Sequence, residues 1–389
     1  MKYYEVMRRK AAFLVLSGLL LACSAGGVEE AMDTDTPNTD TTSETTTPST
    51  TRNGVMVSQT TPYPSSYATE ADQRGTVVQI TYNTRNYVNQ NGGSRQNDAY
   101  VYLPYGYENS NRRYNIIYLV HGHYGDASTT WTAENGIQRK VLDHAIEDGV
   151  IEPVIVVSPT YNYGSPTPNY VDASPYCRAL PQELRNDLIP LVESRYRTYA
   201  ETTDAAGLRA SRDHRVIGGF SMGGVTTWFA LDETLDLFGK FIPMSGDCWS
   251  LGSFAGQNRP TQTADYLIQR IQQQGYTAND YQIWAAAGTS DSAYREILDQ
   301  IEGMATRSAW FNACNMTFHE KAGARHEFLP SVEYVYNALR DFFPGERTTG
   351  IATARAHTTD NVRTYDLQGQ RVSSSYKGLV IENGELRFK

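Results

Sequence analysis

Residues 215–224 read Arg-Val-Ile-Gly-Gly-Phe-Ser-Met-Gly-Gly, an apolar run that leads through G-x-S-x-G into a helical pattern. The pentapeptide alone could be an incidental serine at a glycine-rich strand end. A strand before the motif and a helix after it are the context in which a serine is held on a tight turn with its hydroxyl above a sheet. The stretch therefore predicts Ser221 as a nucleophile and a fold built from strands and helices.

Alternating strands and helices continue on both sides of this stretch. Apolar strand-like runs occupy residues 115–120, 154–157, 215–220, 241–244, 282–287 and 316–320, and helical patterns occupy residues 137–147, 182–196, 225–232, 263–274, 294–304 and 331–343. This alternation predicts an α/β fold with a mostly parallel central sheet and helices on both faces. Functional loops are expected at the carboxyl ends of its strands.

A nucleophilic serine needs an imidazole to accept its proton, and a strand–serine–helix turn is typically followed by its acid and then its histidine. Three histidines lie downstream of Ser221. His319 falls inside a predicted strand and His357 in the C-terminal tail, whereas His326 lies in a loop just before a helix. We therefore predict His326 as the base.

The acid that orients the imidazole has two candidates. Asp291 follows the run 282–287 through a short loop, and Asp247 also ends a strand. Asp291 could instead cap the following helix, although Ser292 could take that task. We predict Asp291 as the acid and keep Asp247 as the second choice.

Two backbone amides are expected to stabilise the oxyanion of the reaction, because preorganised N–H donors serve that purpose in acyl transfer. One is the amide of Met222, directly after the serine. The loop 120–125 supplies the other, with His123 as the predicted donor. His121 and His123 lack a third ligand in this loop, so we predict no metal site.

Composition excludes several classes of protein. The 389 residues carry a formal net charge of -9, which disfavours nucleic acid as a partner. Four cysteines are too few for a disulfide scaffold and show no zinc-site spacing. Disulfide pairing among Cys177, Cys248 and Cys314 stays open.

The two ends of the chain differ from its centre. Residues 1–22 have basic residues followed by a short apolar stretch, and the text Leu20-Leu21-Ala22-Cys23 predicts a lipoprotein-type signal with lipidation at Cys23. An ordinary signal peptide with an incidental cysteine is the alternative, and Met7 could be the true start. Residues 23–55 are rich in Thr, Ser, Pro and acidic residues and predict a disordered stalk.

A globular domain is expected over residues 56–345, followed by a small β-rich tail over residues 346–389. The pair Asn383-Gly384 predicts a hairpin in that tail. The tail resembles C-terminal segments that some secreted bacterial proteins use as sorting signals.

The central region resembles the feruloyl and acetylxylan esterases of carbohydrate esterase family 1, within the α/β-hydrolase superfamily. The matching text is Tyr102-Leu-Pro-Tyr-Gly-Tyr107, Tyr118-Leu-Val-His-Gly122, Gln182-Glu-Leu-Arg-Asn-Asp-Leu188, Ser211-Arg-Asp-His214, Gly218-Gly-Phe-Ser-Met-Gly-Gly224, Met244-Ser-Gly-Asp-Cys-Trp249 and Gly288-Thr-Ser-Asp-Ser-Ala-Tyr294.

The resemblance implies an α/β-hydrolase fold, a triad of Ser221, Asp291 and His326, and no cofactor. It implies that Trp249 lines the substrate site, although a core tryptophan is the alternative. Tyr124 and Asp247 are expected beside the substrate as well. Family members often carry a Gly-rich loop where this chain has His123-Tyr124, and aromatic residues where it has Glu327-Phe328, so the acyl preference stays open.

These features together predict an exported serine esterase that removes feruloyl or related groups from plant cell-wall arabinoxylan. Its partners would be feruloylated or acetylated xylan and, through Cys23, a membrane, which would make it an outer-membrane or cell-surface lipoprotein or else a secreted protein. An acetylxylan esterase is the nearest alternative, and a non-catalytic carbohydrate-binding protein on the same scaffold is a further one.

Overall fold

The computed structural model describes residues 49–89, 92–164, 166–346, 364–366, 379–382 and 385–388. The chain divides into two compact units, Met1–Thr348 and Thr349–Lys389. The predicted signal segment, Cys23 and His357 lie outside the described residues. Within the described part, no helix is both long and apolar enough to cross a membrane.

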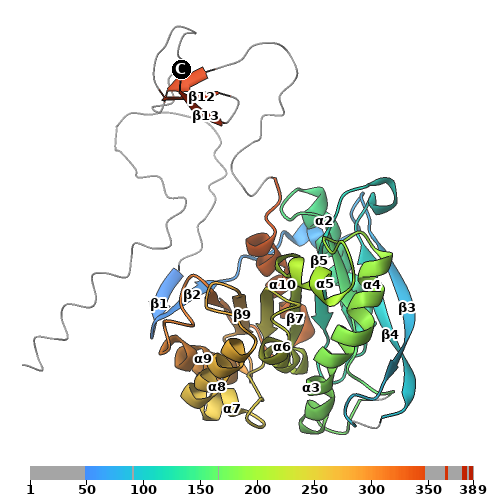
Figure 1. The fold of residues 1–389 in the computed structure, drawn as a ribbon, viewed down its shortest axis with the longest axis vertical. Coiled ribbons are helices and arrows are strands. Elements are labelled where there is room, and N and C mark those ends of the chain that lie inside the picture. The colour runs from blue at the N-terminus through green and yellow to red at the C-terminus, as the bar shows by residue number, and fades with distance from the viewer. Residues whose placement is uncertain are drawn as a thin grey trace, which may run out of the picture. The chain divides into compact units, whose positions relative to one another are not determined.

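The first unit contains one ten-stranded sheet in the order β1-β2-β10-β9-β8-β7-β5-β6-β4-β3. Figure 1 shows β1 and β2 at one edge and β3 and β4 at the other. The seven neighbouring strands β2, β10, β9, β8, β7, β5 and β6 are all parallel to one another. Antiparallel pairing occurs only at the edges, between β1 and β2 and among β6, β4 and β3. The strands are β1 (Ser49–Arg52), β2 (Val55–Gln59), β3 (Thr76–Arg85), β4 (Ser94–Leu103), β5 (Asn115–Val120), β6 (Val154–Ser158), β7 (Arg215–Phe220), β8 (Lys240–Met244), β9 (Gln282–Gly288) and β10 (Met316–Lys321).

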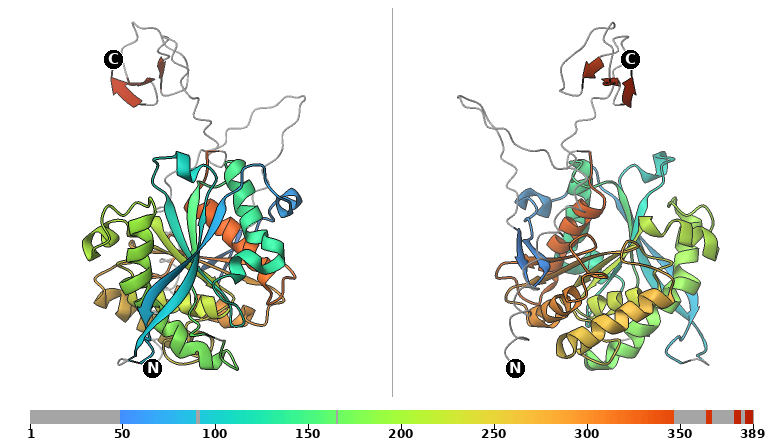
Figure 2. Two further views of the ribbon diagram at one scale, coloured as in Figure 1. Left: turned by 90° about the vertical axis from the view of Figure 1, so that its right-hand side faces the viewer. Right: turned by 60° about the vertical axis from the view of Figure 1, so that its left-hand side comes forward.

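Helices cover both faces of this sheet, as Figure 2 shows in its left view. Successive residues of β6 alternate between two hydrophobic clusters, because side chains along a strand point to opposite faces. One cluster includes α2 and α10, and the other includes α3, α6, α8 and α9. The helices are α1 (Thr129–Thr132), α2 (Ile137–Glu147), α3 (Ser174–Glu183), α4 (Ile189–Arg195), α5 (Ala205–Ala210), α6 (Met222–Glu233), α7 (Ala255–Asn258), α8 (Pro260–Gln273), α9 (Tyr294–Ala305) and α10 (Phe328–Phe342).

Shorter helical turns join these elements. They are η1 (Ser65–Ala68), η2 (Tyr107–Asn109), η3 (Ala133–Gly136), η4 (Val171–Ala173), η5 (Leu184–Leu188) and η6 (Arg212–His214). The segment 182–196, predicted as one helix, is instead α3, the π-helical turn η5 and α4. Pro190 in the first turn of α4 lacks an N–H, so regular α-helical bonding cannot run through this segment.

The edges of the sheet differ most from the sequence-based expectation. β1 begins inside the predicted stalk, and β2 extends the sheet by pairing in parallel with β10. The hairpin of β3 and β4 was not predicted, because its buried and exposed positions alternate and its text is rich in polar residues. Edge strands with one solvated face lack the continuous apolar runs that mark the central strands.

The second unit contains a three-stranded antiparallel sheet, β11 (Thr364–Asp366), β12 (Leu379–Glu382) and β13 (Glu385–Phe388). Glu382 pairs with Glu385, the register expected of the hairpin predicted at Asn383-Gly384. The β-rich character of the tail thus agrees with the sequence.

Candidate active site

Ser221 lies on a strained turn between β7 and α6. Its φ and ψ are 57° and -118°, a region that residues other than glycine rarely adopt. A β-carbon at Gly219 would lie 2.6 Å from the carbonyl oxygen of Val120, and one at Gly223 would overlap the same oxygen. The two glycines of the motif are therefore required by the close approach of β5 to this turn.

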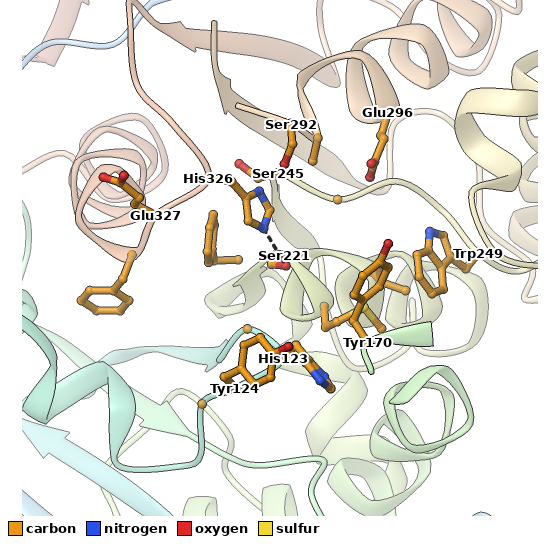
Figure 3. Close-up of a pocket in the computed structure, with 18 of the residues that line it drawn as sticks. His123, Tyr124, Tyr170, Ser221, Ser245, Trp249, Ser292, Glu296, His326 and Glu327 are labelled. Carbon is orange, nitrogen blue, oxygen red and sulfur yellow. Dashed lines mark hydrogen bonds between the residues drawn. The ribbon is translucent and has the colours of Figure 1, made fainter. Parts of the chain in front are cut away.

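The structure brings the three predicted triad residues together. His326 Nε2 lies 2.9 Å from Ser221 Oγ, the contact drawn in Figure 3, and His326 Nδ1 lies 2.7 Å from Asp291 Oδ1. Because a carboxylate accepts, Nδ1 donates to Asp291, which leaves Nε2 to accept from the serine hydroxyl. This tautomer is the one that can take the serine proton.

Asp291 does not cap the following helix, the alternative that the sequence offered, because the N-cap position of α9 is Ala293 and no side chain caps it. Its Oδ1 also accepts from the amide of Ala293 at 2.7 Å, in the loop that leads into α9. The carboxylate is buried, so its orientation toward His326 is held by the protein rather than by water.

The predicted oxyanion donors lie at the same place. Gly122 packs against Ser221, since a β-carbon on Gly122 would lie 3.5 Å from the serine β-carbon, and both His123 and Met222 line the same cavity as Ser221. The Met222 amide begins α6. Neither amide donates to a protein group within the part of the chain that the structure describes, so both remain open to a ligand.

A cavity of about 500 Å³ opens above Ser221 and contains His326 in its wall. This volume falls in the range of small-molecule sites. Its aromatic lining comes from loops and from the ends of β7 and α10, and it consists of Tyr124, Tyr170, Phe220, Trp249, Phe254 and Phe328. A ligand with a flat ring would therefore meet aromatic surface there.

Trp249 is both a core residue and a residue of the cavity wall, the two alternatives that the sequence left open. It is only 4% exposed and belongs to the hydrophobic core, yet it also lines the cavity. Its ring lies 4.8 Å from Phe254 and 6.3 Å from Tyr170, measured between centroids. Tyr124 differs, because it is 83% exposed at the mouth of the cavity.

Asp247 corrects the expectation of a second acid or a substrate contact. It is fully buried and is not among the cavity-lining residues. Its carboxylate accepts from Trp249 Nε1 at 2.5 Å and from the Gln257 amide at 3.0 Å, and burial raises its pKa to about 6. Asp247 thus holds the Trp249 ring from behind, and Asp291 is the aspartate beside His326.

His319 and His121 contact other side chains. His319 stacks on Trp284 with 3.9 Å between ring centroids, and burial lowers its pKa to about 3. His121 bonds to Thr160 at 2.7 Å, and burial lowers its pKa to about 4. Among the described residues, no group of three or more His, Cys, Asp and Glu is arranged to hold a metal ion.

Cys177 and Cys248 are free, buried thiols. Each of the three pairings left open among Cys177, Cys248 and Cys314 would use at least one of them. None of those pairings is present.

Sequence reasoning gave no role to several residues of the cavity wall, among them Tyr170, Ser245, Phe254 and Glu296. Tyr170 lies in a loop with no motif, whereas Ser245 belongs to the matching text Met244–Trp249 but was given no role there. Glu296 lies on α9 five residues after Asp291, and only its nearness to a predicted acid could have drawn attention to it.

A family model described as "Putative esterase" matches residues 93–328. The chain belongs to this esterase family. Endo-1,4-beta-xylanase Y of Acetivibrio thermocellus is 38% identical over 287 residues, which are 72% of this chain and 24% of that protein. An endo-1,4-beta-xylanase/feruloyl esterase of Xylanibacter ruminicola is 28% identical over 190 residues, 46% of this chain and 23% of the relative. The chain thus spans about a quarter of the length of these curated relatives.

Solved structures agree with this esterase assignment. The feruloyl esterase module from Clostridium thermocellum, solved with sinapinate, is 37% identical with a TM-score of 0.61, over 73% of this chain and 93% of that one. A ferulic acid esterase of carbohydrate esterase family 1 from Anaeromyces mucronatus shares the fold, with 19% identity and a TM-score of 0.51 over 72% and 95% of the two chains. The predicted family and α/β-hydrolase fold are confirmed, and so at family level is the predicted enzyme class, a serine carboxylester hydrolase.

Proposed function

We propose that this esterase removes hydroxycinnamoyl groups, feruloyl above all, from plant cell-wall arabinoxylan by a Ser-His-Asp mechanism. The observation that carries the proposal is the hydrogen-bonded series Asp291–His326–Ser221 at the base of an aromatic cavity. The names of the relatives, a xylanase/feruloyl esterase and a feruloyl esterase module, support the same substrate class.

In the proposed reaction, Ser221 Oγ attacks the ester carbonyl carbon while its proton moves to His326 Nε2. The amides of His123 and Met222 donate to the resulting oxyanion. The bond to the sugar oxygen then breaks, and His326 returns the proton to that oxygen, leaving an acyl group on Ser221. Water then attacks the acyl carbon while its proton passes to His326. The bond to Ser221 Oγ breaks, His326 returns the proton to that oxygen, and the carboxylic acid is released.

The two ends of the cavity suit the two halves of such an ester. Figure 3 shows Trp249 and Tyr170 on one side of Ser221 and Glu327 on the other. The Trp249 side is aromatic and partly enclosed, whereas Glu327 is exposed. Because a polysaccharide must extend into solvent, we assign the ring of the acyl group to the Trp249 side and the sugar to the Glu327 side.

Initial rates on methyl ferulate, acetylated xylan and a p-nitrophenyl ester, measured side by side, test the proposal. The wild-type protein should cleave methyl ferulate efficiently, and Ser221→Ala should lower kcat by roughly a thousandfold or more without changing the melting temperature. A preference for acetylated xylan would favour the acetylxylan esterase alternative. Binding of xylan without turnover of any ester would identify a carbohydrate-binding protein.

We further propose that the protein is exported and attached to a membrane by a lipid on Cys23. The basic residues before an apolar stretch and the text Leu20-Leu21-Ala22-Cys23 support this. Radiolabelled palmitate should enter the wild-type protein in bacterial cells but not Cys23→Ser. Export without labelling would favour an ordinary signal peptide and a secreted protein.

A further inference from the structure

Glu296 places a carboxyl group in the wall of the cavity, where the other large side chains are mostly aromatic. It lies on α9 and is half-buried. Figure 3 shows its carboxyl pointing into the cavity on the Trp249 side, across from Glu327. An acidic group in this position lies beside the end of the cavity that we assign to the acyl ring.

This carboxyl has neither a hydrogen bond nor an ion pair within the described part of the chain. Two neighbours on the same helix differ, because Asp299 pairs with Arg295 and Glu302 pairs with Arg52. The Glu296 oxygens are not among the fully buried polar atoms that lack a partner, so they are open to the cavity. A ligand in the cavity can therefore take up the hydrogen-bonding capacity that no described protein group uses.

The surroundings of Glu296 also affect its charge. Burial raises its pKa to about 7, and the nearby carboxylates of Asp247 and Asp291 act in the same direction, whereas His326 opposes them. Near neutral pH the group can therefore accept a hydrogen bond either as a carboxylate or through the carbonyl of the acid.

Glu296 is not part of the proton path. Both ring nitrogens of His326 are already bonded, to Asp291 and to Ser221. The carboxyl is thus free to contact substrate without disturbing the groups that move the proton.

We propose that Glu296 is a specificity-determining residue that accepts a hydrogen bond from the phenolic hydroxyl of the acyl group. The inference rests on the proposed function, and it adds the chemical feature by which the substrate is recognised. A methoxy group has no proton to donate, so the hydroxyl is the substituent that this carboxyl can bind. Rings without a hydroxyl would leave Glu296 unpaired in the occupied cavity.

The test compares kcat/KM for methyl 4-hydroxycinnamate, methyl 4-methoxycinnamate and methyl cinnamate. A hydrogen bond to a charged group corresponds to a roughly ten- to hundredfold preference, which the wild-type protein should show for the hydroxylated ester. Glu296→Leu should reduce that preference to near one, mainly by slowing the hydroxylated ester. Glu296→Gln keeps an acceptor and should retain part of the preference.

Asp299→Asn is the matched control, because it removes an acidic group one turn away that is paired with Arg295 rather than facing the cavity. It should leave the preference unchanged. An unchanged preference in a folded Glu296→Leu variant would overturn the proposal. Equal kcat/KM values of the wild-type protein on all three esters would overturn it as well, and that measurement requires no variant. Failure of the wild type on every cinnamate ester, with cleavage of acetylated xylan, would instead overturn the proposed function and this inference with it.

Discussion

Asp291 and Asp247 both follow strands of the sheet, yet their partners give them different tasks. Asp291 Oδ1 accepts from His326 and from the Ala293 amide. Asp247 accepts from Trp249 and the Gln257 amide and has no contact with His326. Asp291 can thus stabilise an imidazolium, whereas Asp247 can only position the wall of the cavity.

We expect Asp291→Asn to lower kcat by about four orders of magnitude, because the amide favours the wrong imidazole tautomer and removes the stabilising charge. Asp247→Asn should have a much smaller effect on kcat. Steady-state kinetics on one ester, with circular dichroism to verify folding, measures both. The reverse ranking would make Asp247 the acid.

Asp247 should also impose a pH dependence on stability. Its pKa rises from 3.8 to about 6 because burial disfavours the charged form. The folded protein therefore binds this proton more tightly than the unfolded chain does. The free energy of unfolding should fall as pH rises from about 4 to about 6, by roughly 3 kcal/mol at most for this group, and then level off.

Urea unfolding of the wild type and Asp247→Asn at pH 4 and pH 6 isolates this contribution, because other titrating groups are common to both proteins. The variant should lose less stability over this interval. Equal losses in the two proteins would contradict the assignment, whatever the absolute stability of the variant.

At the scale of elements, β7 is anchored at the end opposite Ser221. The Arg215 side chain is fully buried and forms two contacts with Glu193, Nε to Oε1 at 2.5 Å and Nη2 to Oε2 at 2.9 Å. It also donates to the carbonyls of Leu208 and Leu237. One guanidinium thus joins α4, α5 and the loop before β8 to the strand that precedes Ser221.

Arg215→Met should lower the free energy of unfolding by about 3–5 kcal/mol, because it leaves Glu193 buried without its charged partner. Glu193→Leu in the same chain should recover part of that loss. Chemical denaturation of both variants measures the effect. A loss below about 1 kcal/mol for Arg215→Met would mean that Glu193 finds water or another donor.

At the scale of the whole molecule, the site depends on the parallel order of the sheet. Ser221, Asp291 and His326 follow β7, β9 and β10, and Gly122 follows β5. Parallel strands end at the same edge of the sheet, so loops far apart in sequence converge there. The antiparallel strands at the edges extend the sheet without supplying any of these groups.

A chain that ends at Thr348 should keep the wild-type melting temperature and kcat. All residues of the cavity and both hydrophobic clusters belong to the first compact unit, and the second unit forms its own sheet. Differential scanning calorimetry and rates on methyl ferulate check this. Loss of either property on truncation would show that the catalytic unit needs residues 349–389.

Local sequence patterns were enough to predict the strand–serine–helix turn at Ser221, the central strands and the choice of His326 over His319 and His357. These follow from local chemistry, since glycine spacing, apolar runs and loop position are all visible within a few residues. The sequence also predicted the pair Asp291 and His326, which the structure brings to 2.7 Å.

The loops that meet above the sheet could be identified only from the folded chain. The tertiary structure placed Asp247 behind Trp249, brought Tyr170 and Glu296 into the cavity and added β1 to β4 at the edges. The physical reason is that burial and partnership depend on contacts between segments distant in sequence. From the sequence alone, Glu296 cannot be distinguished from an ordinary glutamate on a helix, because its neighbours in space are not known.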